Sequence, residues 1–324
     1  MGGEGMDEFS IIAKYFRPLA KNFAGSLNLS DDAALLTPPE GHELVITKDA
    51  ISEGIHFIGS ESSDLIATKA LRVNLSDIAA MGAQPICYFL ALMLPKNTTE
   101  DWLEKFAEGL KKTGDEFKIS LAGGDTTATN GSLSISITAI GIIPKGKALK
   151  RSGAKIGDDI YVSGTLGDSA LGLGLLSSRA QPRDLGKDFF INRYLLPEPR
   201  LKLGVALRDI ATACMDISDG LAQDLGHICT TSNVGAVIHV NNIPLSSLRG
   251  GKADAAIQYA LTSGDDYELL FTAPPDKKPA IENLAKSLQL PLTCIGKITT
   301  GNNVHILDEN GKEIELAKKG FMHF

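Results

Sequence analysis

The segment KALRVNLSDIAAMGA, residues 69–83, carries the pattern that decides the fold. Apolar residues recur at helical spacing from Asp64 to Met81, which predicts a helix with one buried stripe. That stripe contains Leu65, Leu71, Leu75, Ile78 and Ala79. Asn74 and Asp77 are three positions apart, so the helix places both on a polar face opposite the stripe. The continuous apolar run at 86–94 then predicts a buried strand, and together the two elements favour an α/β architecture.

Helical and strand patterns also alternate on both sides of this segment. Helices are expected at 7–20, 100–112 and 169–176, and a further helix is expected to begin near Ser218. Strands are expected at 44–46, 119–122, 133–142, 160–163, 236–240, 268–272 and 293–298. Residues 144–157 are polar, rich in lysine and glycine, and without periodicity, so we place a domain boundary there. The sequence therefore predicts two domains of α/β (α+β) type, residues 1–148 and 149–324.

The composition is that of an ordinary globular protein, with 324 residues, 43% hydrophobic and 22% charged, and a formal net charge of −7. This charge gives no general attraction to nucleic acid or to acidic membranes, so we expect neither as a partner. No apolar run reaches the roughly 18 residues that a membrane-spanning helix needs, and the first residues lack the pattern of a signal peptide. The cysteines form no CxxC pair, which predicts buried free thiols at Cys87, Cys214, Cys229 and Cys294. A cytoplasmic location is expected.

The common nucleotide-binding and catalytic motifs are not found in the sequence. Residues 141–148 fit the pattern GxxxxGK[ST] until the last position, where Ala148 has no hydroxyl to offer magnesium. No helix is expected after this segment, so we do not interpret it as a P-loop. No GxSxG, HExxH or zinc-type Cys/His spacing occurs either. A nucleophilic or zinc-dependent mechanism is therefore not indicated.

Aspartates instead recur in several short segments that are far apart in the sequence. These are Asp31–Asp32, Thr47–Asp49, Asn74 with Asp77, GGDTT at 123–127, DISDG at 216–220 and GDD at 264–266. Any one of them alone is usually a turn or a helix cap. Together they offer hard oxygen ligands, and magnesium takes only one or two carboxylates and shares its other positions with phosphates and water. The pattern therefore indicates a nucleotide site with several magnesium ions.

Two of these segments have further local features. Gly123 and Gly124 follow an apolar strand pattern, so the backbone there can approach a ligand closely and present N–H groups to an anion. Asp216 and Asp219 repeat the three-residue spacing of the first helix, with Ser218 as the expected N-cap. We therefore expect these residues where strands meet loops or where helices begin.

Read in order, the segments resemble the thiamine-monophosphate kinase family, which belongs to the aminoimidazole ribonucleotide synthetase-like superfamily. The likeness is carried by KALRVNLSDIAAMGA at 69–83, GGDTT at 123–127, RSGAKIGDDIYVSGTLGDSALGL at 151–173 and MDISDGL at 215–221. The segments EGIHF at 53–57, SGDDYELLF at 263–271 and GFMHF at 320–324 are more specific to the kinases. The resemblance extends from Phe9 to Phe324.

The resemblance implies an N-terminal domain that binds ATP and magnesium and pairs its sheet in a homodimer. It implies a C-terminal α/β domain that closes over the active site. The implied reaction converts ATP and thiamine monophosphate to ADP and thiamine diphosphate, the last step of thiamine diphosphate biosynthesis. The acceptor is a phosphate monoester with a second pKa of about 6, so its attacking oxygen is mostly ionised at pH 7 and no general base is required. The main obstacle is repulsion between two polyanions, which several Mg2+ ions would relieve.

Matching motif to motif, the resemblance also implies roles for single residues. The magnesium-binding positions are Asp32, Thr47, Lys48, Asp49, Asp77, Asp125, Asp216 and Asp219, with Thr47 and Lys48 acting partly through backbone oxygen. Asp77, Asp125 and Asp219 would assist the transfer. The ATP contacts are Gly124, Asp125, Arg151 and Ser218, and the thiamine monophosphate contacts are His56, Asp265 and Phe321. The chain departs from the usual family pattern at Ser30, Lys48, Asp265 and Met322, and none of these departures removes a core magnesium carboxylate.

Two other functions remain open from the sequence. A related ATP-dependent synthetase, such as aminoimidazole ribonucleotide synthetase, would use ATP to activate an oxygen and would release phosphate. A nucleotide or magnesium sensor would bind these ligands without turnover. The GFMHF and His56 segments disfavour the first alternative, and the number of separated aspartates disfavours the second.

Overall fold

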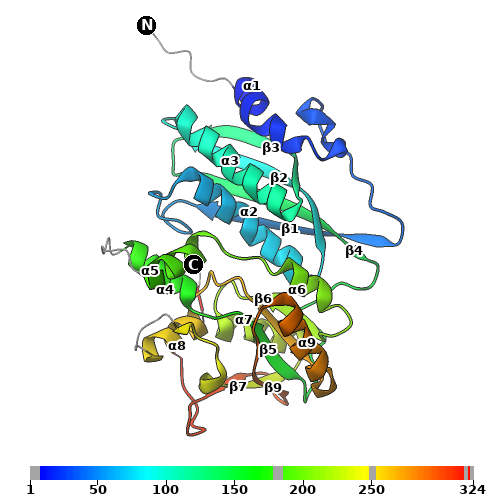
Figure 1. Cartoon of the computed structure of the whole chain (residues 1–324), viewed down its shortest axis with the longest axis vertical. Coiled ribbons are helices and arrows are strands. Elements are labelled where there is room, and N and C mark those ends of the chain that lie inside the picture. Colours follow the sequence, from blue (N-terminus) through cyan, green and yellow to red (C-terminus); the bar gives the residue numbers. More distant parts are fainter. Residues whose placement is uncertain (1–7, 178–184, 248–252, 317–319, 322–324) are drawn as a thin grey trace. The chain divides into compact units, whose positions relative to one another are not determined.

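The protein is described by a computed structural model that covers residues 8–177, 185–247, 253–316 and 320–321. The chain forms two compact units. The first contains Met1–Ile78 and Gln84–Lys145, and the second contains Ala79–Ala83 and Gly146–Phe324. Each unit is built around a sheet of its own (Figure 1).

The first unit has a four-stranded sheet with helices on one face (Figure 1). The strand order is β1-β4-β2-β3, and the strands are β1 (His42–Ser52), β2 (Gln84–Pro95), β3 (Ser120–Thr129) and β4 (Ser134–Pro144). β2 and β3 run parallel and are joined by α3 (Glu100–Phe117), whereas β4 is antiparallel to both of its neighbours. A parallel pair needs such a crossover connection, and β3 is left at one edge of the sheet.

The two helices of this unit differ in how much of their surface is covered. On α3, Leu103, Phe106 and Leu110 are buried, and the Thr99 hydroxyl caps the helix by accepting from the Trp102 N–H at 3.2 Å. α2 (Ser63–Ala80) is buried on nearly all sides. Asn74 is only 1% exposed and Asp77 is half-buried, so the predicted polar face of this helix is largely covered.

The N-terminal segment is helical without a break from Glu8 to Ala20, as predicted, but the helix type changes along it, and a separate short helix follows. The pieces are α1 (Glu8–Ile11), η1 (Ile12–Phe16), η2 (Arg17–Ala20) and η3 (Ala24–Leu29). Pro18 lies at the start of the 3-10 helix η2, and its missing N–H removes one hydrogen bond that a regular α-helix would make there. Further along, Phe23 and Leu36 pack against a cluster that contains Cys87 and Ile140 of the sheet.

The second unit has a six-stranded sheet in the order β10-β7-β9-β5-β8-β6. Its strands are β5 (Asp159–Ser163), β6 (Ala213–Asp216), β7 (Gly235–His239), β8 (Leu269–Ala273), β9 (Leu292–Thr299) and β10 (Val304–Leu307). β10 and β7 are parallel, and the other neighbouring pairs are antiparallel.

Both faces of this second sheet are covered. Successive residues of a strand point to opposite faces, and Ile160 and Val162 belong to one core cluster whereas Tyr161 belongs to the other. The first cluster includes residues of α7 (Leu221–Ser232) and α8 (Ala253–Thr262), and the second includes residues of α6 (Leu201–Ala206) and α9 (Lys278–Leu288). Two further helices, α4 (Asp168–Ser177) and α5 (Leu185–Leu195), pack on each other. Near-continuous apolar runs in β5 and β8 follow from this double coverage.

The predicted two-domain α/β fold is confirmed, and each expected strand is present. Several elements were not predicted, namely α5, α6, α8, α9, β6 and β10. The P-loop-like segment 141–148 consists of the end of β4 and a turn at residues 145–146, and no helix follows it. Cys87, Cys214 and Cys229 are buried free thiols as expected, but the prediction was wrong for Cys294, which is exposed. Within the described residues, no helix is both long and apolar enough to span a membrane.

Candidate active site

Strand β1 and helix α2 bring four polar residues of the first unit together. Thr47 and Asp49 are two positions apart on β1, so they share the face of the sheet that meets α2. The Thr47 hydroxyl donates to Asp77 Oδ2, and the Asp49 N–H donates to Asn74 Oδ1 at 3.1 Å. Burial, and secondly repulsion by Asp77, raise the pKa of Asp49 to about 6. Two carboxylates and a hydroxyl therefore converge, which is a donor set that suits Mg2+.

Lys48 does not join this group through its side chain. It lies between Thr47 and Asp49 on the strand, so its side chain points to the opposite face of the sheet, where it is exposed. Only its main chain is available to the group. The position of Thr47–Asp49 also corrects an expectation, because these residues lie inside β1, which continues to Ser52, and not in a loop after it.

A cavity of about 470 Å³ in the first unit is lined by the second set of expected site residues. Asp32, Gly124 and Asp125 line it together with apolar side chains that include Ile12 and Phe16. The volume lies within the range of about 300–1,000 Å³ that is usual for small-molecule sites. Apolar walls with a few polar groups are also usual for such sites.

Gly123 and Gly124 form part of this cavity within strand β3, not after it as predicted. Gly124 pairs with Leu90, and a Cβ at position 124 would lie 1.9 Å from the Leu90 carbonyl oxygen. The close pairing of the two backbones thus requires glycine at this position. At this part of the cavity the wall is the main chain of the edge strand β3. A ligand can therefore approach the backbone closely, as the sequence predicted.

The second unit holds Asp216, Ser218 and Asp219 at the end of β6 and in the loop that follows. Asp216 is the last residue of β6 and is buried, whereas Asp219 precedes the first residue of α7, Leu221. Both residues therefore lie where a strand meets a loop and a helix begins, as expected, but the N-cap of α7 is Gly220, so the prediction of Ser218 as N-cap was wrong.

Asp224, which the sequence analysis missed, organises this loop. Its Oδ2 accepts hydrogen bonds from the N–H groups of Ser218, Asp219 and Gly220, each at 3.1 Å. It thus supplies the capping that was assigned to Ser218. Burial raises the pKa of Asp224 to about 7. An acidic residue in the first turn is a known sign of a helix start and would have indicated this role.

Asp219, Asp224 and His227 also lie close enough to bind one cation, with one donor atom from each within 4.8 Å of the others. Asp224 already accepts three backbone hydrogen bonds, and an imidazole is a poor ligand for Mg2+. We therefore interpret Asp224 as a structural cap. Asp219 is the member of this group that fits a magnesium ligand.

The expected acceptor residues of the second unit lie next to this loop. The Asp265 N–H donates to the Ser218 carbonyl at 3.0 Å, and the Phe321 N–H donates to the Asp219 carbonyl at 3.1 Å. Gln223, on α7, donates through Nε2 to Asp219 Oδ2 at 2.9 Å and to the Phe321 carbonyl at 3.3 Å. The structure thus places Ser218, Asp219, Asp265 and Phe321 side by side, although they come from three distant parts of the sequence.

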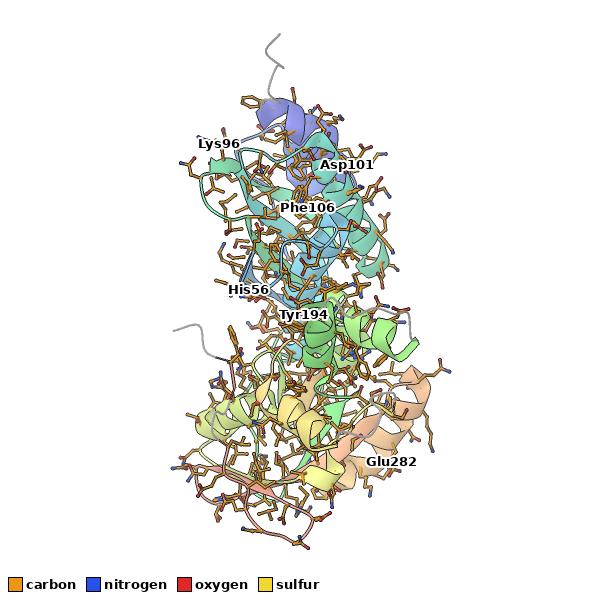
Figure 2. All side chains as sticks on the ribbon, turned by 90° about the vertical axis from the view of Figure 1, so that its left-hand side faces the viewer. His56, Lys96, Asp101, Phe106, Tyr194 and Glu282 are labelled. Carbon is orange, nitrogen blue, oxygen red and sulfur yellow. The ribbon has the colours of Figure 1, made fainter. Side chains whose placement is uncertain are left out.

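His56 and Arg151 are the two remaining expected site residues, and they lie on separate segments. His56 lies on the loop after β1, away from the Asp101 end of the unit (Figure 2), and its Nδ1 accepts from the Ser52 N–H at 3.1 Å. This bond fixes the ring, and in the neutral imidazole it places the proton on Nε2. The Arg151 side chain is exposed, and its carbonyl accepts from the Ser232 hydroxyl at 3.3 Å. Met322 lies outside the described residues.

Comparisons with known proteins support the resemblance seen in the sequence. Residues 30–143 match the N-terminal domain of the AIR synthase related proteins, and residues 155–309 match the C-terminal domain. The chain is 43% identical to the thiamine-monophosphate kinase of Escherichia coli K12, over 98% of both chains. The chain belongs to the thiamine-monophosphate kinase family. A second member, from Bacillus subtilis, is 35% identical over 98% of this chain and 100% of that one.

Solved structures of the family agree with the fold. The thiamine-monophosphate kinase of Stenotrophomonas maltophilia is 42% identical, with a TM-score of 0.84 over 93% of this chain and 98% of that chain. AaThiL complexed with AMPPCP and TMP is 31% identical, with a TM-score of 0.79 over 100% of this chain and 99% of that chain. The hydrogenase maturation protein HypE in complex with ATP shares the fold, with a TM-score of 0.77 at 21% identity over 98% of this chain and 96% of that one.

Proposed function

We propose that the protein transfers a phosphoryl group from ATP directly to thiamine monophosphate, giving ADP and thiamine diphosphate. The observation that carries this proposal is the full-length likeness to thiamine-monophosphate kinases, at 43% identity over 98% of both chains. A structure of the same family binds TMP together with AMPPCP, an analogue of ATP. Both substrates of the proposed reaction are thus accommodated by this fold.

We assign the donor nucleotide to the cavity of the first unit. Its apolar residues, among them Ile12, Phe16 and Leu29, suit a purine base. The Gly123–Gly124 backbone lines the same cavity and offers N–H groups for phosphate oxygens. Arg151 and Ser218 of the second unit would contribute further contacts to ATP, Arg151 through its planar guanidinium.

The two acidic groups described above fit Mg2+ by the chemistry of their donors. In the first unit, Asp49 and Asp77 with the Thr47 hydroxyl supply hard oxygen atoms, and Asp32 and Asp125 line the nucleotide cavity. In the second unit, Asp216 and Asp219 supply two more carboxylates, and Lys48 would contribute its carbonyl oxygen. When bound, the ions would neutralise phosphate charge as the transfer proceeds. Asp77, Asp125 and Asp219 are the carboxylates to which we assign this assisting role.

For the acceptor, we assign His56, Asp265 and Phe321. The proton on His56 Nε2 can be donated to a phosphate oxygen, since Nδ1 accepts from Ser52. Asp265 is a carboxylate that suits a cation or an amino group, and thiamine carries both a thiazolium ring and an aminopyrimidine. Phe321 is 46% exposed and offers an aromatic surface. Because the acceptor phosphate is already ionised near neutral pH, none of these residues needs to act as a general base.

The proposal includes three features that rest on the family resemblance. Residues 1–148 would bind ATP and magnesium and form a homodimer, residues 149–324 would close over the active site, and the enzyme would act in the cytoplasm.

One product analysis tests the proposed function. The protein is incubated with ATP, Mg2+ and thiamine monophosphate, and thiamine diphosphate, ADP and free phosphate are quantified. We expect ADP and thiamine diphosphate in equal amounts, without free phosphate or phosphorylated enzyme. Release of phosphate without thiamine diphosphate would indicate the synthetase-like reaction, and nucleotide binding without turnover would indicate a sensor. Thiamine, whose hydroxyl is not ionised, serves as the control acceptor and is expected to react poorly.

A further inference from the structure

The turn at residues 264–267, which carries Asp265, has an unusual backbone. Asp265 has φ +68° and Tyr267 has φ +51°, both in the left-handed region that residues with a Cβ seldom adopt. For a bulky residue such as tyrosine this conformation is a real outlier, and glycine would adopt it without strain. Strained positions of this kind persist only where the surroundings over-determine them, and they concentrate at functional sites. The side chain of Tyr267 is therefore a candidate for a specific role.

The backbone conformation determines where the side chains of this turn point. Asp266 and Glu268 are buried, whereas Asp265 and Tyr267 are half-buried. The two half-buried side chains meet, since the Tyr267 hydroxyl donates to Asp265 Oδ1 at 3.1 Å. A hydrogen bond from a phenol to a carboxylate is charge-assisted, so it favours one orientation of the Asp265 side chain.

On one side, the turn is fixed by the loop that carries Ser218. The Asp265 N–H donates to the Ser218 carbonyl at 3.0 Å, and the Tyr267 N–H donates to the Ile217 carbonyl at 2.9 Å. Gly264 packs so closely that a Cβ there would lie 2.0 Å from the Ser218 carbonyl oxygen. The N–H groups of Asp265 and Tyr267 thus both bind the loop that carries the proposed magnesium ligand Asp219.

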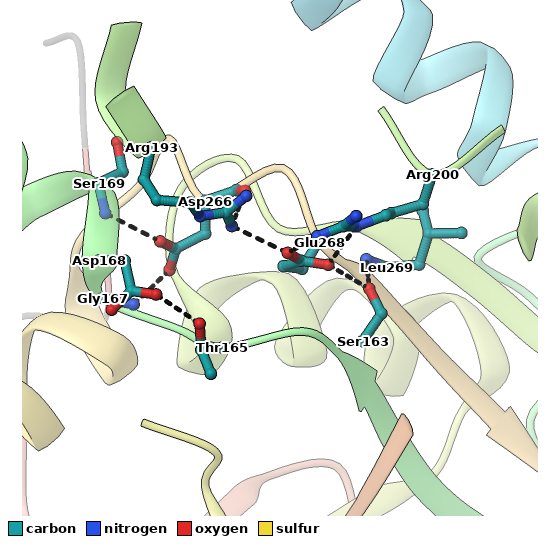
Figure 3. Close-up of polar contacts among 10 residues, drawn as sticks. All are labelled: Ser163, Thr165, Gly167, Asp168, Ser169, Arg193, Arg200, Asp266, Glu268 and Leu269. Atoms are coloured by element: carbon teal, nitrogen blue, oxygen red, sulfur yellow. Dashed lines mark hydrogen bonds and ion pairs between the residues drawn. The ribbon is translucent and has the colours of Figure 1, made fainter. Parts of the chain in front are cut away.

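On the other side, a buried ionic network holds the turn (Figure 3). Arg193 Nη2 donates to the Asp266 carbonyl at 3.1 Å and to Glu268 Oε1 at 2.8 Å. Arg200 binds the same carboxylate through Nε at 2.7 Å and Nη2 at 2.5 Å. The Asp266 carboxylate accepts from the Gly167 N–H at 2.6 Å. The main chain of the turn is therefore held by Arg193, whose guanidinium also binds the buried Glu268 carboxylate.

We propose that Tyr267 is a positioning residue of the acceptor site, which orients the Asp265 carboxylate on a turn held in place by Arg193. The inference rests on the proposed function, in which Asp265 contacts thiamine monophosphate. A preset carboxylate loses less conformational entropy when the substrate binds, so it contributes to affinity even though Tyr267 itself need not touch the reacting atoms. The side-chain pair Asp265–Tyr267 then contributes to the affinity for thiamine monophosphate and has little influence on the affinity for ATP.

The test is a steady-state comparison of Tyr267→Phe with the matched control Tyr259→Phe. Tyr259 lies on α8, is 38% exposed, and loses the same hydroxyl in its variant. For Tyr267→Phe we expect the KM for thiamine monophosphate to rise about fivefold to tenfold, which corresponds to about 1–1.4 kcal/mol, the usual net contribution of one hydrogen bond. The KM for ATP and the melting temperature should stay near those of the unchanged protein. Tyr259→Phe should leave both KM values unchanged.

A double-mutant cycle separates this inference from the proposed function. If Tyr267 acts through Asp265, Tyr267→Phe has no further effect in an Asp265→Ala background. Arg193→Lys, which keeps the charge but cannot reach both acceptors, should raise the same KM. If the effects of Tyr267→Phe and Asp265→Ala on the KM for thiamine monophosphate multiply in the double variant, the positioning role is overturned while the kinase assignment stands. The same holds if Tyr267→Phe leaves this KM unchanged. An unchanged KM for thiamine monophosphate in Asp265→Ala would overturn the acceptor assignment as well.

Discussion

Replacing Asp77 by asparagine tests the acidic group of the first unit most directly. Asparagine keeps the shape of the side chain and an oxygen that can accept from the Thr47 hydroxyl, so only the charge is lost. If Asp77 assists the transfer, the variant loses one strong electrostatic stabiliser of the transition state. We expect turnover to fall at least about a hundredfold, which corresponds to about 3 kcal/mol.

The same substitution should make the metal-free protein slightly more stable. The pKa of Asp49 is raised from 3.8 to about 6, and a tenfold change in acidity corresponds to about 1.4 kcal/mol, so the whole rise is worth about 3 kcal/mol. Burial is the larger cause and Asp77 the smaller, so repulsion by Asp77 accounts for less than about 1.5 kcal/mol. Because this repulsion acts fully only once pH exceeds the folded pKa of Asp49, the gain should appear at neutral pH and fade as the pH falls below about 6.

Two measurements on the same preparation check this prediction. Thiamine diphosphate formation is followed at saturating ATP and Mg2+, and thermal melts are recorded without Mg2+. The control is Asp115→Asn, an exposed aspartate of α3 that pairs with Lys111, for which we expect normal turnover and an unchanged melt. Near-normal turnover of Asp77→Asn would refute its role in the reaction. A variant that unfolds would show instead that Asp77 is mainly structural.

The remaining predictions concern stability. Gly124→Ala should lower the free energy of unfolding by about 1–3 kcal/mol, because its Cβ would meet a backbone oxygen of the facing strand at 1.9 Å. In the same denaturant titration, Gly226→Ala in α7, with open space around its Cβ, should raise the free energy of unfolding by about 0.5–1 kcal/mol. Burial raises the pKa of Asp266 to about 7, so the folded protein holds the extra proton and its stability falls as pH rises from about 4 to about 7. Asp266→Asn should reduce this pH dependence, and the parts due to Asp49 and Asp224 should remain. Urea titrations at pH 5 and pH 8 measure the stability difference, and a difference in Asp266→Asn equal to that of the unchanged protein would contradict the prediction. Glu268→Gln removes a buried carboxylate that balances two half-buried arginines, and it should cost about 3–5 kcal/mol. By the same assay, Glu282→Gln on α9 should stay within about 0.5 kcal/mol.

The fold was largely predictable because its strongest signals are local. The periodicity of residues 64–81 and the apolar run that follows fixed α2 and β2, and the predicted segments at 160–163 and 293–298 correspond to β5 and β9. The prediction failed where polar residues interrupt a strand. Thr47–Asp49 was expected to lead from a strand into a loop, because lysine and aspartate are rare in strands. In the structure their contacts with α2 keep β1 extended to Ser52.

The site was predictable residue by residue but not as an arrangement. The likeness of the motifs identified the aspartates, but the N-cap of α7 was wrongly assigned to Ser218. The capping by Asp224 was overlooked in favour of the nearer hydroxyl of Ser218. The pairing of Arg193 with Glu268 joins residues 75 positions apart, and no local pattern relates them. Contacts of that kind follow from tertiary packing alone, which is also why the Tyr267–Asp265 bond required the structure.

The backbone wall at Gly124 also has a practical consequence for inhibitors of this protein. Drug resistance often arises when a side chain that lines a binding site is exchanged for another. At this part of the cavity the ligand would meet main chain, and position 124 cannot acquire a side chain without forcing β3 away from Leu90. A compound that derives its affinity from these backbone groups would therefore leave the target few routes of escape.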